Sequence, residues 1–267
     1  MNGFTEEQLH RYNRHIILPE VGAKGQLKLL NAKVFIVGAG GLGCPVGYYL
    51  AAAGVGTIAL MDNDTVEISN LQRQIAHSTK TIGMHKVDSA KATFEALNPD
   101  VKVIGIKERI NKDNILDLFR DYDIVVDGSD NFPTRYLIND ACVMLKKTLV
   151  SGAILRFEGQ VTTIVPGEGH CYRCLFEEMP PAGLVPTCQE AGVIGAIPGV
   201  VGALQAMEVT KAILGKGSLL KNELLIYDAL KASFRKVKIP KNPDCPVCGD
   251  NPTITELTDG PAEICRV

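Results

Sequence analysis

The chain has 267 residues, 46% of them hydrophobic and 22% charged, so it can bury a core large enough to fold without a partner. Its net charge of −2, with cations scattered along the sequence, argues against nucleic acid as a partner. The N-terminus lacks the basic and then apolar pattern of a secretory signal, and the longest apolar stretch, 191–204, contains glycines and Pro198. We therefore expect a cytoplasmic protein that spans no membrane.

Helix signals come first along the chain. Thr5 and Gln8 have the spacing of a capping box, which predicts a helix through about Arg14, and a short helix is expected over 26–30. Strand and helix signals then alternate, with strands expected at 33–38, 57–61, 101–106, 123–127 and 148–151, and helices at 42–53, 86–97, 113–119 and 132–146. This alternation predicts a doubly wound, mainly parallel, Rossmann-like α/β sheet whose ligand crevice lies beyond the carboxyl ends of the strands.

The pattern changes in the second half of the chain. A strand near 160–165, a helix over 198–214 and β-rich runs at 223–227 and 233–239 predict an extension of the sheet by antiparallel strands. We expect a single domain over 1–267, with an N-terminal helical arm at 5–32, a nucleotide-binding half at 33–152, a substrate-binding half with a metal site at 153–249, and a tail at 250–267.

The first strand signal runs into the glycine motif Gly38-Ala-Gly-Gly-Leu-Gly43. Glycines in this spacing, between a strand and a helix, let the backbone approach a phosphate at the helix N-terminus. An acid at the end of the second strand can hold ribose hydroxyls. The pattern predicts a nucleotide site that uses Gly38, Gly40, Gly41, Gly43 and Asp62; a turn without a ligand and a helix-capping Asp62 are the alternatives.

A polar connection, 64–74, follows the second strand. Ser69 and Gln72 have the spacing of a second capping box, which predicts a new helix there, and Lys86 leads the next helix. A diphosphate lying on backbone amides does not need such a group of cations, whereas a triphosphate does. We therefore expect a nucleoside triphosphate bound by Asp64, Asn70, Arg73, Gln74 and Lys86, although a solvated surface position is the alternative for any single cation.

Asp130 and Asn131 follow the fourth strand signal, at the edge of the sheet where the ligand is expected. Magnesium is held in proteins by one or two carboxylates together with the phosphates of the substrate. We therefore expect Asp130 to bind Mg²⁺ and Asn131 to line the nucleotide site. The alternative is that Asp130 only caps the helix that begins near 131.

Four of the eight cysteines form two Cys-x-x-Cys pairs, which is the ligand set of a structural zinc site: Cys171, Cys174, Cys245 and Cys248. Redox activity of the pairs is the alternative. Cys188 follows a proline- and glycine-rich passage, where a thiol could attack an activated acyl group, but an inert thiol fits as well. Cys44 and Cys142 lie on helix faces, which predicts core packing.

The chain resembles one family, the MoeB/ThiF adenylyltransferases, which are bacterial relatives of ubiquitin-activating enzymes. The resemblance covers about residues 5–249 and rests on an ordered set of motifs: Arg11-Tyr-Asn-Arg-His-Ile-Ile-Leu18, the glycine motif, Ser69-Asn-Leu-Gln-Arg-Gln74, Ser129-Asp-Asn131, Cys171-Tyr-Arg-Cys174, Thr187-Cys-Gln-Glu-Ala-Gly-Val193 and Cys245-Pro-Val-Cys248. It implies a homodimer that uses MgATP to adenylate the C-terminal glycine of a ubiquitin-fold sulfur carrier protein ending in Gly-Gly, with release of pyrophosphate, in molybdopterin, thiamine or a related cofactor biosynthesis.

The resemblance also implies a role for individual residues. Asp62 would hold the ribose, Asp130 would hold Mg²⁺, and the phosphates would be bound by Asn70, Arg73 and Lys86. Arg14 would reach the nucleotide of the other subunit. Cys188 corresponds to a loop cysteine that some members use in thioester or persulfide chemistry. The longer eukaryotic relatives carry an appended rhodanese-like domain that this sequence lacks, so we expect a separate sulfurtransferase.

Other functions compete with this interpretation. An NAD-dependent Rossmann oxidoreductase would explain the glycine motif and Asp62 but gives no role to Arg73, Lys86 or Asp130. A non-catalytic scaffold for a ubiquitin-like tail would be expected to lack the metal and phosphate residues, and they are present. Within the family, the pathway stays open, and so does a branch that activates a tRNA base.

Overall fold

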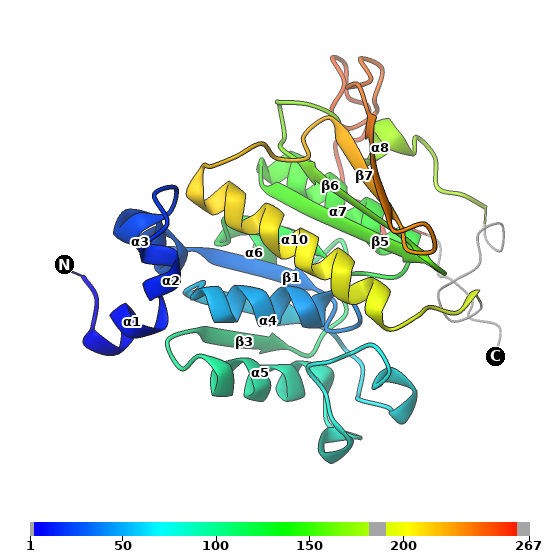
Figure 1. Cartoon of the computed structure of the whole chain (residues 1–267). Coiled ribbons are helices and arrows are strands. Elements are labelled where there is room, and N and C mark those ends of the chain that lie inside the picture. The colour runs from blue at the N-terminus through cyan, green and yellow to red at the C-terminus, as the bar shows by residue number, and fades with distance from the viewer. Residues whose placement is uncertain (1–2, 182–190, 261–267) are drawn as a thin grey trace.

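One sheet of eight strands forms the centre of the molecule (Figure 1). The computed structural model describes residues 3–181 and 191–260. From one edge to the other, the strands are β3 (Lys102–Ile106), β2 (Thr57–Met61), β1 (Lys33–Val37), β4 (Ile124–Asp127), β5 (Thr148–Leu155), β6 (Glu158–Ile164), β7 (Glu223–Asp228) and β8 (Ser233–Lys238). The pairings from β3 to β5 are parallel, and those from β5 to β8 are antiparallel. The predicted Rossmann-like α/β fold with an antiparallel extension is confirmed.

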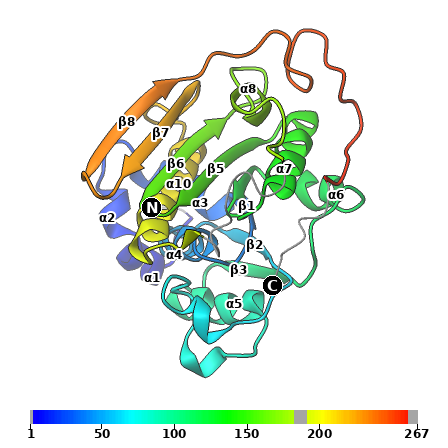
Figure 2. The same cartoon turned by 90° about the vertical axis from the view of Figure 1, so that its right-hand side faces the viewer.

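Helices cover both faces of the sheet (Figures 1 and 2). One face is covered by α3 (Gly22–Asn31), α4 (Gly43–Ala53), α5 (Lys86–Leu97) and α10 (Ala196–Leu214), and the other by α6 (Ile115–Arg120), α7 (Phe132–Leu145) and α8 (Tyr172–Leu175). Successive side chains of a strand point to opposite faces. Val34 and Ile36 of β1 therefore join one core, and Phe35 and Val37 join the other. This is why the central strands β1 and β4 are apolar over most of their length.

The N-terminal arm consists of α1 (Glu6–Arg11) and α2 (Asn13–Ile16). The capping box of Thr5 and Gln8 is confirmed, but the single helix predicted through Arg14 is broken at Tyr12. The Tyr12 ring is buried against Gly54 at the end of α4, and its hydroxyl accepts a hydrogen bond from Asn98. Anchoring this ring interrupts the helix, and it holds the arm at the amino ends of the strands.

The helix predicted at Ser69 and Gln72 is wrong. The structure has two 3₁₀ turns in this connection, η1 (Ile68–Asn70) and η2 (Thr79–Thr81). The side chain of Asn70 accepts a hydrogen bond from the Glu67 amide at 3.0 Å. The capping residue is therefore Glu67 and not the predicted Ser69, and it closes a single 3₁₀ turn. Such local bonds of Asn compete with helix formation.

Helix α10 is long and apolar enough to cross a membrane by length and composition, with a mean hydropathy of 1.2. Half of it is buried in the protein, where it packs on β5, β6 and α4. Its polar residues Gln205 and Glu208 are also buried and form hydrogen bonds to the sheet and its connections. These features are those of the core helix of a folded domain.

The segment 250–260 of the predicted tail runs from the cysteine-rich loop along α7 towards α6 (Figure 2). Ile254 and Leu257 pack on the core beneath it, and the Asp259 carboxylate accepts a hydrogen bond from the Lys112 amide at 2.9 Å. One sheet thus runs through both predicted halves of the chain, and the single-domain organisation stays a prediction.

Candidate nucleotide site and metal centre

A cavity of about 380 Å³ lies at the carboxyl ends of the parallel strands. We call it the nucleotide cavity. It brings together most of the residues that the sequence predicts for a nucleotide site, which come from the connections that follow β1, β2 and β4 and from the first residue of α5: Gly38, Gly40, Gly41, Asp62, Asp64, Arg73, Gln74, Lys86, Asp130 and Asn131. This is the edge at which doubly wound sheets bind their ligands.

The glycine loop enters the cavity between β1 and α4. Gly38 has a φ of +93°, and a Cβ there would lie 2.8 Å from the Gly128 carbonyl oxygen, so no other residue fits. Within the described part of the chain, the amides of Gly40 and Gly41 donate to no protein acceptor. Amides before a helix N-terminus are suited to bind phosphate oxygens.

Asp62 lies beside the glycine loop and caps no helix. Its Oδ2 accepts a hydrogen bond from the Ala39 amide at 2.8 Å, and its Oδ1 accepts one from the Asp64 amide at 2.9 Å. Burial raises the pKa of Asp62 above its ordinary 3.8, and the positive charge of Lys86 opposes that shift. Each carboxylate oxygen has a further lone pair, so the group can also accept ribose hydroxyls.

The predicted cations face the cavity. Lys86 begins α5, is almost fully buried, and forms an ion pair with Asp64 at 2.7 Å. Arg73 donates to the Ser69 carbonyl at 3.1 Å. Gln74 is buried, and its Oε1 has no hydrogen-bond partner among the described residues. The two predicted cations can pair with an anionic group of a ligand, and the unpaired Gln74 oxygen can accept a hydrogen bond from a donor of the same ligand.

Asp130 and Asn131 have different surroundings. Asn131 is the N-cap of α7, and its Oδ1 accepts a hydrogen bond from the Thr134 amide at 3.0 Å. The interpretation of Asp130 as a helix cap is therefore wrong. Its exposed carboxylate accepts one hydrogen bond within the described chain, from the Asn131 amide group at 3.5 Å, so its oxygens can coordinate a cation at the mouth of the cavity.

The structure does not bring every predicted residue to the cavity. Gly43 packs beneath the glycine loop, and Asn70 is used in the cap of η1. Arg14 lies on α2, in an arm that contacts the carboxyl ends of α4 and α5, at the opposite end of the sheet from the cavity of its own chain. Cys188 lies outside the described residues.

Several residues of the cavity were missed from the sequence. Glu108, Arg109 and Ile110 line it just after β3, and the rule that ligands lie beyond strand ends would have found them. Arg135 lines it from the first turn of α7, and no sequence motif marked it. His77 is buried beneath the glycine loop, with Nε2 3.0 Å from the Ala39 carbonyl oxygen, and sequence alone gave it no role.

A second cavity of about 370 Å³ adjoins the first. We call it the tail cavity. It lies over β5 and β6 and beside α8, and it is lined largely by apolar side chains, among them Phe132, Leu155, Tyr172 and Phe176. Both cavities are lined by the same three residues: Asp130, Arg135 and Ile154. A ligand in one cavity can therefore reach a ligand in the other.

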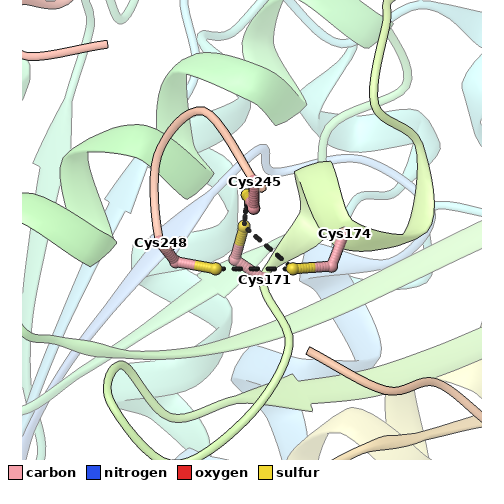
Figure 3. Close-up of side chains that lie close together, drawn as sticks. All are labelled: Cys171, Cys174, Cys245 and Cys248. Carbon is pink, nitrogen blue, oxygen red and sulfur yellow. Dashed lines mark hydrogen bonds between the residues drawn. The ribbon is translucent and has the colours of Figure 1, made fainter. Parts of the chain in front are cut away.

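The two Cys-x-x-Cys pairs meet although they are far apart in the sequence (Figure 3). The Sγ atoms of Cys171 and Cys245 are 3.5 Å apart, those of Cys174 and Cys248 3.4 Å, and those of Cys171 and Cys174 4.0 Å. Thiolates bound tetrahedrally about 2.3 Å from a zinc ion would lie about 3.8 Å from one another. The geometry fits zinc and is too wide for disulfides.

The four thiols also interact with one another. Hydrogen bonds within the cluster lower the pKa of Cys174 and raise the pKa of Cys171, and, against the opposing hydrogen bond with Cys171, Cys174 together with burial raises that of Cys248, so metal binding would have to release the remaining protons. Four protein ligands leave no coordination position for water, so the ion would be structural. Cys44 and Cys142 are buried, and burial raises the pKa of Cys44 to about 12. Their predicted role in core packing is confirmed.

Comparison with known proteins gives four findings. A model of the ThiF family matches residues 12–247. The chain is 53% identical over 261 residues to the sulfur carrier protein adenylyltransferase of Thermus thermophilus, covering 96% of both chains. It is 48% identical over 260 residues to the adenylyltransferase and sulfurtransferase MOCS3 of Aedes aegypti, covering 97% of this chain and 60% of that one. A solved structure of E. coli MccB with ATP is 28% identical, with a TM-score of 0.77, covering 93% of this chain and 75% of that one.

Proposed function

Since the chain belongs to the ThiF family, we propose that it activates the C-terminal carboxylate of a ubiquitin-fold sulfur carrier protein as an acyl-adenylate, using ATP and releasing pyrophosphate. The predicted enzyme class, an adenylyltransferase, is confirmed by relatives that carry this activity in their names. The observation that carries the proposal is that the nucleotide cavity, lined by the glycine loop, Arg73 and Lys86, adjoins the largely apolar tail cavity at Asp130, Arg135 and Ile154.

In this proposal the ATP lies in the nucleotide cavity. The amides of Gly40 and Gly41 and the cations Arg73 and Lys86 bind the phosphates, and Asp62 accepts the ribose hydroxyls. The fit is supported by glycine amides that donate to no acceptor in the described part of the chain, and by cations that line the cavity. Lys86 would exchange its ion pair with Asp64 for the phosphate when the nucleotide binds.

Two metal ions belong to the proposal. Mg²⁺, held by Asp130 and the phosphates of ATP, would neutralise phosphate charge. Zn²⁺, held by the four cysteines, would fix the loop 241–249 onto α7 and α8. The support is the accessible carboxylate of Asp130 and the spacing of the four Sγ atoms.

The carrier tail would lie in the tail cavity, with its terminal carboxylate at the junction with the nucleotide cavity. A carboxylate oxygen attacks the α-phosphorus, the bond from this phosphorus to the bridging oxygen breaks, and pyrophosphate leaves. The attacking group is already an anion, so no general base is required. The protein contributes alignment and charge neutralisation, which agrees with a cavity lined by Arg and Lys.

We further propose a homodimer in which Arg14 completes the nucleotide cavity of the partner. The support is the position of α2, which keeps Arg14 away from the cavity of its own chain. Mixing an inactive Arg14→Ala chain with an inactive Asp130→Ala chain should restore part of the activity, because one cavity of each mixed dimer is then intact. Absence of recovery after subunit exchange would refute this arrangement.

The proposed reaction is tested by pyrophosphate exchange with purified protein and a carrier ending in Gly-Gly. Arg73→Ala and Asp130→Ala should abolish carrier-dependent exchange and leave the thermal unfolding curve unchanged. Arg120→Ala and Asp117→Ala are matched controls, because they remove the same charges from exposed positions on α6. Normal exchange rates in the Arg73 or Asp130 variant would contradict the proposed roles.

The alternatives are tested with the same protein. MgATP at 100 times its dissociation constant should raise the free energy of unfolding by about 2.7 kcal/mol, and NAD should not. Stabilisation by NAD alone would favour the oxidoreductase. Mass measurement of a co-purified partner would identify the carrier and its pathway, whereas adenylation of RNA would favour the tRNA branch. We also propose a separate sulfurtransferase, since the Thermus relative has adenylyltransferase alone in its name. Cytoplasmic localisation is proposed because the long apolar helix α10 packs on β5, β6 and α4.

A further inference from the structure

The last residue of β4, Asp127, is the centre of a buried polar network at the junction of the two cavities. Its side chain is 1% exposed. Its Oδ1 accepts hydrogen bonds from the amide and the hydroxyl of Ser129, at 2.9 and 2.6 Å. Its Oδ2 accepts one from the Ser151 hydroxyl at 3.1 Å and pairs with Arg135 at 3.5 Å. The carboxylate thus closes the turn that leads from β4 to Asp130.

Arg135 holds the same turn from the helix side. One guanidinium nitrogen donates to the Ser129 carbonyl at 2.6 Å, and another donates to the Gly152 carbonyl at 2.8 Å. The Gly152 carbonyl belongs to β5, which forms the floor of the tail cavity. A single planar group therefore ties the loop of one cavity to the strand of the other.

A residue on the opposite face of the sheet also binds the main chain of β4 and β5 here. Gln205 of α10 donates to the Asp127 carbonyl at 2.9 Å and to the Val150 carbonyl at 3.3 Å. A Cβ at position 152 would lie 2.4 Å from the Gln205 side chain, so this contact requires Gly152. Helices on both faces thus fix the carboxyl end of β4 and the middle of β5.

A contribution to the stability of the fold does not by itself explain the buried ion pair of Asp127 and Arg135. Replacing a buried ion pair by apolar residues of similar volume is often neutral or stabilising, because desolvation offsets much of the attraction. Among the described residues, the contacts of Asp127 and Arg135 include Ser129, Ser151 and Gly152, which all border a cavity, and Ser129 directly precedes Asp130.

We propose that Asp127 and Arg135 are positioning residues, which hold the turn 128–131 so that Asp130 presents its carboxylate to the magnesium of bound ATP. This inference rests on the proposed function. It assigns the pair a role in the metal-dependent part of nucleotide binding and none in binding the nucleoside, whose ribose would be held by Asp62. Among residues 3–181 and 191–260, the Asp130 side chain has a single weak hydrogen bond, so its position depends on this turn.

The test compares ATP affinity at saturating Mg²⁺ with ATP affinity in EDTA, by calorimetry. Arg135→Lys keeps the charge, but one ammonium group cannot hold both carbonyls in the geometry of the fork. Loss of such outer contacts typically lowers metal affinity by about 10 to 100-fold. We expect the magnesium-dependent gain in ATP affinity to fall by about 10-fold in this variant, with adenosine binding unchanged. Ser129→Ala, a milder change, should lower it by about 5-fold.

Glu208→Gln is the matched control, because it disturbs another buried network, with Thr163 and the Leu220 amide, that touches neither cavity. An unchanged magnesium gain in Arg135→Lys and Ser129→Ala would overturn the inference and leave the proposed function intact. An equal loss in Glu208→Gln would overturn it too, as a general effect of destabilisation. If Arg135→Lys does not fold, Ser129→Ala decides. A wild-type protein that binds ATP equally well without Mg²⁺ would overturn both proposals.

Discussion

Gly43→Ala tests whether the third glycine of the motif acts through packing. Gly43 opens α4 directly beneath Gly38, and it does not line the nucleotide cavity. A Cβ at this position would lie 1.8 Å from the Gly38 carbonyl oxygen. Real Cβ atoms do not approach other atoms closer than 3.0 Å, so the two segments would have to separate by 3.0 − 1.8 = 1.2 Å.

The expected magnitude follows from the group that must move. Overpacking a core costs about 1–3 kcal/mol when side chains can shift. Here the clash is with a backbone carbonyl, so we expect a loss of about 3 kcal/mol or more in the free energy of unfolding. For a domain of this size that corresponds to a fall of about 6–12 °C in Tm. The displaced glycine loop should also lose the stabilisation that MgATP gives to the wild type.

Gly199→Ala is the control, and it should act in the opposite direction. Gly199 lies in α10, and a Cβ there meets no atom within 4 Å. Replacing glycine by alanine inside a helix stabilises by about 0.5–1 kcal/mol. Thermal unfolding of both variants, with and without MgATP, gives the comparison. A Gly43→Ala protein with the wild-type Tm and the wild-type MgATP shift would refute the packing argument.

Three further outcomes are expected. Cys248→Ser should lose bound zinc by metal analysis and unfold at lower denaturant, because zinc binding contributes directly to folding. Burial raises the pKa of Asp62, so on acidification the affinity for ATP should begin to fall at a pH above 3.8. Calorimetry should show that Asp62→Asn weakens ATP binding and removes this pH dependence of the affinity. Burial lowers the pKa of His77 below 6.5, so the unfolded chain binds more protons near that pH. The stability that neutral His77 contributes is complete above pH 6.5 and is lost as the pH falls through the folded pKa, and His77→Gln should flatten the acid side of the Tm profile.

The sequence predicts those elements that have a regular hydrophobic period, and those sites whose motif has a local physical cause. Strands such as β1 are apolar throughout, and α7 carries a capping Asn131 with Pro133 in its first turn, so their positions follow from local chemistry. The residues at the strand ends, Asp62 and Asp130, were found because parallel strands end at one edge of the sheet. The four cysteines were found from their spacing.

The missed features depend on contacts distant in sequence. Tyr12 interrupts the first helix because its ring packs on Gly54, which no local pattern indicates. Asn70 was assigned to phosphate, but its side chain closes a 3₁₀ turn with the Glu67 amide. Arg135 reads in the sequence as an ordinary helix cation, and only the meeting of β4, β5 and α7 shows that its fork holds two carbonyls.

The groups around the nucleotide cavity differ in what fixes them. Asp127 and Arg135 are set by folding, since buried partners on both faces of the sheet hold them, and their loss should change stability and activity together. Arg73 and Asp130 each have one protein hydrogen bond among the described residues, so bound ligand must order them, and their loss should affect activity alone. Adenylyl transfer requires both kinds of residue. The buried residues would align the attacking carboxylate with the phosphate, and the residues ordered by ligand would neutralise the negative charge of the phosphates.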